Sequence, residues 1–489
     1  MKLYKSIIYT LTACFLLSSC NDYLDKLPDN RTSLNSAESI GLLLVNAYPK
    51  GGYTSLCEVM SDNAGEKGPS AYIETLINKD QYTYKEVFSS KYQGSPDYYW
   101  TSCYNAIAHA NQALDAIEEN GDGEELNSYK AEALLARAYS HFMLVNLFAK
   151  PYNKATAASD LGIPYVKEVE NVLLKEYKRN TVKEVYDFIE ADLTAGFNLI
   201  DDTRYSVPKY HFNSAAAAAF AARFYLWRNA SDEDLQKSVS FASKVFTGDV
   251  ASSLRDWNGY YSVKSYYDKK AQYTKAVEKP NLLLVETTDP WGYYYAAIRY
   301  SLSVDKYREI FLSSNVKGLE LAYGVHGNDK SANVPKYQLY KIKDNPSSTS
   351  FYAAYMNVLL STDEALFNRI EANAQLNNIS EAITDINFLL QKIVEKYNPA
   401  IHTVTASDIT KFYSNTTSEK EAIVKFVLDI KRKHFIHEGM RWFDVRRHGI
   451  TVTHQVTGEE PVVLKADDPR RLLQIPEDAI ANGLTPNKR

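Results

Sequence analysis

Apolar residues recur every three to four positions along most of this chain. The rhythm is clearest over residues 98–117, and such spacing places apolar side chains on one face of an amphipathic helix. Stretches of this kind follow one another in sequence and predict helix pairs near residues 98–149, 181–247 and 351–396. Paired helices that bury their apolar stripes against their neighbours are typical of repeat scaffolds. We therefore expect a mainly α, tetratricopeptide-like fold.

Polar residues mark where several of these helices begin. Thr181 is followed three residues later by Glu184, and Ser231 is followed in the same way by Asp234. This spacing predicts a capping box at both helix starts, in which the two side chains satisfy each other's backbone N–H groups. Residues 351–376 are interpreted as one continuous helix.

Two regions fit no helix pair. Residues 249–345 are long, irregular and rich in tyrosine and tryptophan, and residues 398–420 read as a polar loop. Long irregular segments in a compact chain usually carry function. We expect the ligand-binding face to lie in the region 249–345.

The densest pattern of apolar and charged residues covers residues 421–449. An amphipathic helix is followed by a short second helix, and Glu438–Arg441 and Asp444–Arg447 are spaced to form i, i+3 ion pairs. A zinc-protease helix is excluded because Arg441 stands where H-E-x-x-H needs its second histidine. The segment is therefore interpreted as a structural closing motif. Its key residues are Glu438, Arg441, Trp442, Asp444 and Arg447.

The first residues read as an export signal. Lys2 and Lys5 precede an apolar run over 7–17 that is too short to span a bilayer. Small residues then lead to Cys20, as in a bacterial lipobox. We expect residues 1–19 to be removed and Cys20 to be lipidated, which would hold the protein on a membrane without a spanning helix. An ordinary secretory signal is the alternative.

Composition narrows the functional classes. The chain has 489 residues and a net charge of -5, with no block of basic residues, so no nucleic-acid partner is expected. Cys57 and Cys103 remain in the mature chain, either as a disulfide or as two buried thiols. No motif for a nucleophile, a phosphate loop or a metal site is found. We expect no cofactor except, at most, a structural calcium ion at residues 121–124.

Three motifs resemble those of one known family. E-G-x-R-W-F-D-x-R-R from Glu438, W-x-x-x-Y-N-x-I from Trp100 and G-I-P-Y-V from Gly162 are similar to motifs of the SusD/RagB family, the surface lipoproteins of Bacteroidota. The motifs span the mature chain, so the resemblance implies a single domain over residues 20–489. One departure is Ser361, where relatives usually carry an arginine, and this loosens an expected ion pair with Glu364.

The resemblance also implies a function. It predicts a non-catalytic protein, anchored in the outer membrane and facing outward, that captures a glycan and passes it to a SusC-like TonB-dependent transporter. Two alternatives are kept. The first is a peptide-binding surface lipoprotein, as the RagB branch of the family implies. The second is a surface hydrolase.

Candidate ligand contacts follow from the chemistry of sugars. A sugar ring has an apolar face and a rim of hydroxyls, so it needs flat aromatic rings with polar groups around them. The turn over residues 289–295 supplies such rings, and its Pro290 and Gly292 favour exposure. A second aromatic turn covers residues 256–261. The ligand-binding candidates are Trp291, Tyr294, Trp257, Tyr260, Tyr99 and Asp62.

Overall fold

The computed structural model describes residues 34–68, 75–86, 91–170, 175–295, 297–328, 331–343, 345 and 347–489. The predicted signal peptide and Cys20 lie outside these residues. Within the described ranges, no helix is both long enough and apolar enough to cross a membrane.

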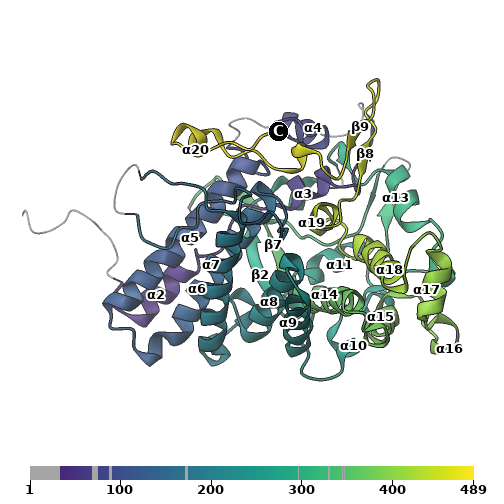
Figure 1. Cartoon of the computed structure of the whole chain (residues 1–489), viewed down its shortest axis with the longest axis horizontal. Coiled ribbons are helices and arrows are strands. Elements are labelled where there is room, and N and C mark those ends of the chain that lie inside the picture. Colours follow the sequence, from purple (N-terminus) through teal and green to yellow (C-terminus); the bar gives the residue numbers. More distant parts are fainter. Residues whose placement is uncertain are drawn as a thin grey trace, which may run out of the picture.

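A scaffold of paired helices makes up most of the molecule and confirms the expected fold class (Figure 1). The long helices of its first half are α2 (Ala37–Leu44), α5 (Pro96–Glu119), α6 (Asn127–Phe148), α7 (Val182–Leu199), α8 (Ser214–Arg228) and α9 (Asp232–Lys244). Those of its second half are α14 (Thr362–Gln375), α15 (Ile379–Ile393), α18 (Glu419–His434) and α19 (Met440–Arg447). Neighbouring helices pack as pairs, and α14 joins the two halves because it contacts α8, α9, α15 and α18.

Small residues allow the first helices to approach closely. A Cβ atom placed on Gly196 of α7 would lie 2.8 Å from the Leu135 side chain and 3.0 Å from the Ala131 carbonyl oxygen of α6. Helix α8 is alanine-rich and buried over most of its length. The scaffold therefore depends on short side chains at the contacts between helix backbones.

One of the two predicted capping boxes is present. The Thr181 hydroxyl accepts a hydrogen bond from Glu184 N at 3.2 Å, and the Glu184 carboxylate accepts from Thr181 N at 2.8 Å. At the start of α9 the prediction is wrong, because the Ser231 side chain makes no capping bond. The Asp234 carboxylate accepts instead from the Arg228 guanidinium, with Nη2 and Oδ1 2.5 Å apart.

A three-stranded antiparallel sheet lies between the two groups of helices, in the order β2 (Asn281–Thr287), β7 (Tyr352–Ser361), β6 (Tyr340–Ile342). The interpretation of 351–376 as one helix is therefore wrong in its first part. That part pairs with β2, for example Leu284 with Val358, and the ladder overrides any local helical preference. Helix α14 begins only after Ser361, whose hydroxyl accepts from Glu364 N at 3.2 Å.

The regions expected to be irregular are built from short elements. Residues 249–345 contain α10 (Val250–Ser253), η4 (Trp257–Tyr261), α11 (Tyr266–Tyr273), α12 (Pro290–Tyr294), β3 (Tyr300–Ser301), α13 (Val304–Phe311), η5 (Val316–Gly318), β4 (His326–Gly327) and β5 (Ala332–Asn333), besides β2 and β6. Residues 398–420 contain α16 (Pro399–His402) and α17 (Ala406–Phe412), so the expected polar loop is partly helical.

Further short elements connect the long helices or follow them in the chain. They are α3 (Thr54–Met60), β1 (Gly65–Glu66), α4 (Leu76–Tyr82), η1 (Glu124–Leu126), η2 (Asp202–Arg204), η3 (Pro208–Tyr210), β8 (Val452–His454), β9 (Val462–Leu464), η6 (Pro469–Arg471) and α20 (Glu477–Ala481). Strand β1 pairs with β3, β4 with β5, and β8 with β9. Cys57 on α3 and Cys103 on α5 are buried free thiols, so they form no disulfide.

Candidate ligand-binding surface

The closing motif is buried and ties the last helices to α3. The Glu58 carboxylate of α3 accepts from His437 N at 2.8 Å and from Gly439 N at 3.0 Å. Gly439 adopts φ +74°, and a Cβ there would lie 3.1 Å from Cys57 Cβ. Burial raises the pKa of Glu58 to about 7 against these hydrogen bonds. The motif therefore rests on a carboxylate that is costly to ionise.

Only one of the two predicted ion pairs within the motif forms. Arg447 Nη1 lies 3.5 Å from Asp444 Oδ1. The predicted Glu438–Arg441 pair is wrong, because Glu438 accepts from Lys336 and, at 2.7 Å, from the Tyr273 hydroxyl. These partners come from the region 249–345, which the spacing within one helix could not reveal.

Asp62 forms an internal ion pair with Arg441. Arg441 Nε and Nη2 lie 2.8 and 2.9 Å from the two Asp62 carboxylate oxygens, and Arg432 Nη2 lies 3.4 Å from Oδ2. Burial would raise the pKa of Asp62, but the two guanidinium groups outweigh it and hold the pKa well below its usual range. Its carboxylate is thus engaged by the closing motif, and its selection as a ligand contact stays a prediction.

Further pairs complete the motif. Lys431 Nζ lies 2.8 Å from Asp444 Oδ1 with both side chains buried, and Arg447 Nη2 lies 2.6 Å from Glu371 Oε1. Trp442 is fully buried. The motif therefore has the geometry of a packing element.

The turn around Trp291 is buried, which corrects the expectation of exposure. Trp291 is 0% exposed. Pro290 occupies the first turn of α12, where proline is favourable, and the Asp289 carboxylate caps that helix by accepting from Trp291 N at 2.7 Å. Gly292 lets the Tyr355 ring approach, since a Cβ there would lie 2.0 Å from Tyr355 Cδ1. The proline and glycine thus serve close packing.

Two other aromatic candidates are also buried. Trp257 is 0% exposed and lies among Tyr261, Tyr273 and Tyr323, with ring centroids 5.1 to 5.8 Å apart. Tyr99 is buried in the helix core. Neither ring is accessible to a ligand in this structure. The Tyr294 side chain lies outside the described part of the chain.

Tyr260 is the candidate that reaches solvent. It is 40% exposed, and Tyr267 on the following helix is 79% exposed. Tyr266 is half-buried and meets the His326 ring edge to face at 5.1 Å. We call the exposed segment that carries Tyr260, Tyr266 and Tyr267, together with the His326 ring that Tyr266 contacts, the tyrosine face.

Basic side chains flank the tyrosine face. Lys264 Nζ lies 4.5 Å from the Tyr260 ring centroid, and Lys270 Nζ lies 5.6 Å from that of Tyr266. Flat rings beside hydrogen-bond donors suit both sugars and peptides. Sequence reasoning missed Tyr266 and Tyr267 as site residues, although Ser265 and Asp268 signal the helix start that presents them.

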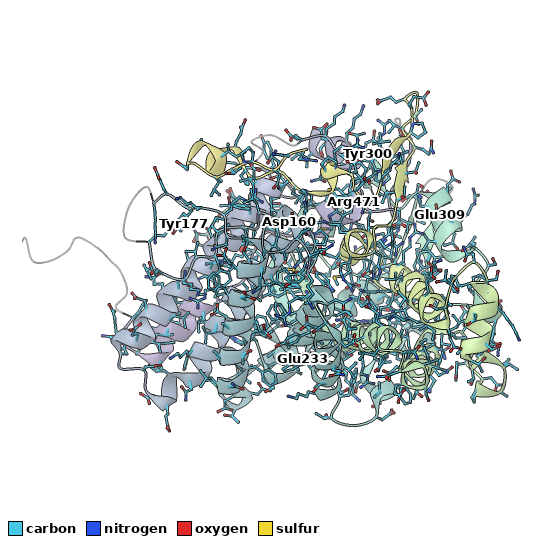
Figure 2. The ribbon with its side chains drawn as sticks, viewed as in Figure 1. Asp160, Tyr177, Glu233, Tyr300, Glu309 and Arg471 are labelled. Carbon is cyan, nitrogen blue, oxygen red and sulfur yellow. The ribbon has the colours of Figure 1, made fainter. Side chains whose placement is uncertain are left out.

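A hollow of about 540 Å³ opens elsewhere, between α5 and α20. Figure 2 labels Tyr177, which lies on the rim of this hollow, at the upper left near α20. The helix α11, which carries Tyr266 and Tyr267 of the tyrosine face, lies right of centre in Figure 1. The lining of the hollow includes Trp100, Tyr104, Glu170, Tyr177 and Asn482. Its volume falls in the range of small-ligand sites.

Within the described residues, no cluster of three or more histidine, cysteine or acidic side chains is arranged to hold a metal ion. At the segment considered for calcium, the Asp122 carboxylate contacts Lys130 Nζ at 2.6 Å. His434 Nε2 lies 3.5 Å from Asp363 Oδ1, and His437 Nε2 accepts from Val334 N at 3.2 Å. These side chains serve internal contacts.

Two family descriptions match the chain in succession. Residues 22–226 match the family described as "Starch-binding associating with outer membrane", and residues 225–471 match the "SusD family". SusD-like protein P2 of Formosa agariphila is 30% identical over 161 residues, which cover 32% of this chain. The matched stretch spans 28% of the length of that curated relative.

Solved structures share the fold over nearly the whole chain. A SusD superfamily protein from Bacteroides thetaiotaomicron has a TM-score of 0.65 at 18% identity, covering 94% of this chain and 100% of its own. One from Bacteroides fragilis has a TM-score of 0.68 at 17% identity, covering 93% and 99%. A SusD-like carbohydrate binding protein from Bacteroides vulgatus has a TM-score of 0.64 at 16% identity, covering 92% and 96%.

Proposed function

Because this chain belongs to the SusD family, we propose that it is a non-catalytic surface lipoprotein that binds a glycan and delivers it to a SusC-like TonB-dependent transporter. Lipidation at Cys20 would anchor it in the outer membrane, with the folded domain facing outward. The family description that mentions starch binding and the outer membrane supports this proposal.

The observation that carries the binding proposal is the tyrosine face. Most large aromatic side chains in the described ranges are buried or half-buried, whereas Tyr260 and Tyr267 present their rings to solvent within eight residues of each other. Exposed rings on a folded surface lose apolar hydration when a sugar stacks on them. Asn258 is already engaged, since its Oδ1 accepts from Lys396 N at 2.9 Å, so the polar contacts would come from Lys264 and the tyrosine hydroxyls.

Calorimetry on the soluble form that starts at Asn21 tests this proposal. We expect saturable binding to one glycan in a panel of host and plant oligosaccharides, about tenfold weaker in Tyr267→Ala or Tyr260→Ala, a loss of about 1.4 kcal/mol. Tyr210→Ala is the matched control, because Tyr210 is similarly exposed on η3. Binding of a peptide digest alone would favour the RagB-like alternative, and turnover of the bound glycan would favour a hydrolase.

Anchoring and partnership are tested in cells. Replacing Cys20→Ser should release the protein from the outer-membrane fraction, because one lipid-modified residue is the proposed anchor. The unmodified protein should copurify with a TonB-dependent transporter and be cleaved by protease added to intact cells. Retention of the variant in the membrane would contradict lipid anchoring, and absence of a transporter from the purified material would contradict the delivery step.

A further inference from the structure

We propose that the hollow between α5 and α20 is a second ligand site, which takes a pyranose unit of a neutral oligosaccharide. The inference rests on the proposed glycan-binding function but concerns a different part of the molecule from the tyrosine face. It is carried by an aromatic floor, a polar rim and the charge around them.

The floor of the hollow is formed by two rings on α5, the half-buried Tyr104 and the edge of the indole of Trp100, which is 7% exposed. The centroids of Trp100 and Tyr104 lie 4.9 Å apart, with planes inclined at 50°. Trp100 is braced from behind by Phe148, whose ring meets it edge to face at 4.8 Å. The Tyr104 hydroxyl donates to the Pro164 carbonyl oxygen at 2.9 Å. Because core contacts fix these rings, a sugar stacking on them would pay little to order the protein.

The rim of the hollow supplies polar groups. The Tyr177 hydroxyl donates to the Glu170 carboxylate, and Lys175 Nζ lies 5.4 Å from the Tyr177 ring centroid. On the opposite side, Asn482 donates its amide to the Asp478 carbonyl oxygen at 2.8 Å. Carboxylate and amide oxygens around flat rings are the acceptors that hydroxyl donors of a sugar require.

Charge around the hollow selects the kind of sugar. Glu170 and Glu176 line it with a single amine, Lys175, and Lys175 also lies 3.4 Å from the Glu168 carboxylate. One turn before Trp100, burial and the nearby Asp478 and Glu477 carboxylates raise the pKa of Asp97 to about 6, although Lys91, whose Nζ lies 3.0 Å from Asp478 Oδ2, opposes the shift. This acidic setting repels uronate and sulfated sugars, so the ligand is a neutral oligosaccharide.

Tryptophan fluorescence gives a signal specific to this site. Trp100 is the one tryptophan of five that lines the hollow, at 7% exposure, and the other four are 0 to 4% exposed. We expect maltohexaose, xylohexaose or mannohexaose to change Trp100 emission saturably, whereas trigalacturonate should not. The change should disappear in Trp100→Phe, and affinity should fall at least tenfold in Tyr177→Ala. Tyr210→Ala, a matched surface tyrosine, should keep both.

Three outcomes would overturn the inference. One is glycan binding that Tyr267→Ala abolishes while Tyr177→Ala and Trp100→Phe leave it intact, which would preserve the proposed function and remove this site. A second is a crystal structure grown with maltohexaose, xylohexaose or mannohexaose in which the hollow holds no sugar. If no neutral oligosaccharide binds by fluorescence or calorimetry at millimolar concentration, both the second site and glycan binding by the isolated protein fail.

Discussion

Arg223 on α8 and Glu364 on α14 form a buried ion pair in which Nε and Nη2 each lie 2.5 Å from a carboxylate oxygen. Arg223 Nη2 also donates to the Leu359 carbonyl oxygen of β7 at 2.6 Å. The absence of an arginine at Ser361 therefore does not leave Glu364 unpaired, which corrects the expectation of a loosened contact. One guanidinium joins two helices and the central strand.

Replacing Arg223→Leu should lower the free energy of unfolding by about 3 to 5 kcal/mol, because Glu364 would keep a buried charge without its partner. Urea denaturation of the soluble form measures this change. The control is Lys183→Ala, which removes an exposed ion pair with Asp187 and should leave the denaturation midpoint unchanged. A double change to Arg223→Leu and Glu364→Leu should recover much of the lost stability, because no buried charge is left unpaired. Failure to recover it would show that the single variant loses stability through altered packing and not through the unpaired charge.

Replacing Trp257→Ala should destabilise the protein by about 3 to 5 kcal/mol, since a large buried side chain leaves a cavity. Tyr260→Ala, three residues later and partly exposed, should change stability by no more than about 0.5 kcal/mol. Thermal unfolding followed by circular dichroism compares the two variants. Equal losses would contradict the division between a buried tryptophan and a surface tyrosine.

Replacing Gly292→Ala should destabilise the fold by about 1 to 3 kcal/mol, because the added methyl group overlaps the Tyr355 ring. Gly248→Ala is the matched control, since a Cβ at that position meets no atom within 4 Å. Chemical denaturation measures the free energy of unfolding of both variants. A neutral result for Gly292→Ala would mean that the Tyr355 ring can move aside without cost.

Glu58 should make stability depend on pH in the direction opposite to that of most carboxylates. Its pKa is raised from 4.5 to about 7 in the folded protein, so the folded state holds a proton that the unfolded state has already lost. Its contribution is present below pH 4.5 and is lost as pH rises through 7. The loss amounts to about 3 kcal/mol at 1.36 kcal/mol per pKa unit.

The measurement for Glu58 is the free energy of unfolding from pH 4.5 to 8 in the unmodified protein and in Glu58→Gln. The difference between the two curves should fall across this interval, whatever the variant costs overall. Subtraction removes the contribution of Asp289, whose pKa burial raises to about 6. A constant difference would mean that Glu58 is ionised throughout.

The long helices were predictable because their apolar residues repeat with a helical period over many turns. Strand β7 was not, because its apolar run is buried in the middle of the sheet, between β2 and β6, and has no period that separates a strand from a helix. The pairing residues of β2 lie more than 60 positions earlier in the chain. The capping box at Ser231 failed for a related reason, since Arg228 competes for Asp234.

The site was less predictable than the fold. Trp257 and Tyr260 stand three residues apart, yet one is buried and the other exposed. The partners that cover Trp257, such as Tyr273 and Tyr323, come from other elements. Pro290 and Gly292 predict an interruption of regular structure, but they do not indicate which side chains of the turn pack against the core. Exposure is a property of tertiary packing, which residue type alone does not determine.

The hydrogen bonds of Glu58 link the order of synthesis to the completion of the fold. The donors at His437 and Gly439 lie 379 and 381 residues after it. At 5 to 20 residues per second, they are made about 20 to 75 s after the carboxylate that needs them. Helix α3 therefore has to stay hydrated until the chain is nearly complete. A chain that ends before His437 would lack both donors, so this closure of α3 requires a nearly full-length chain.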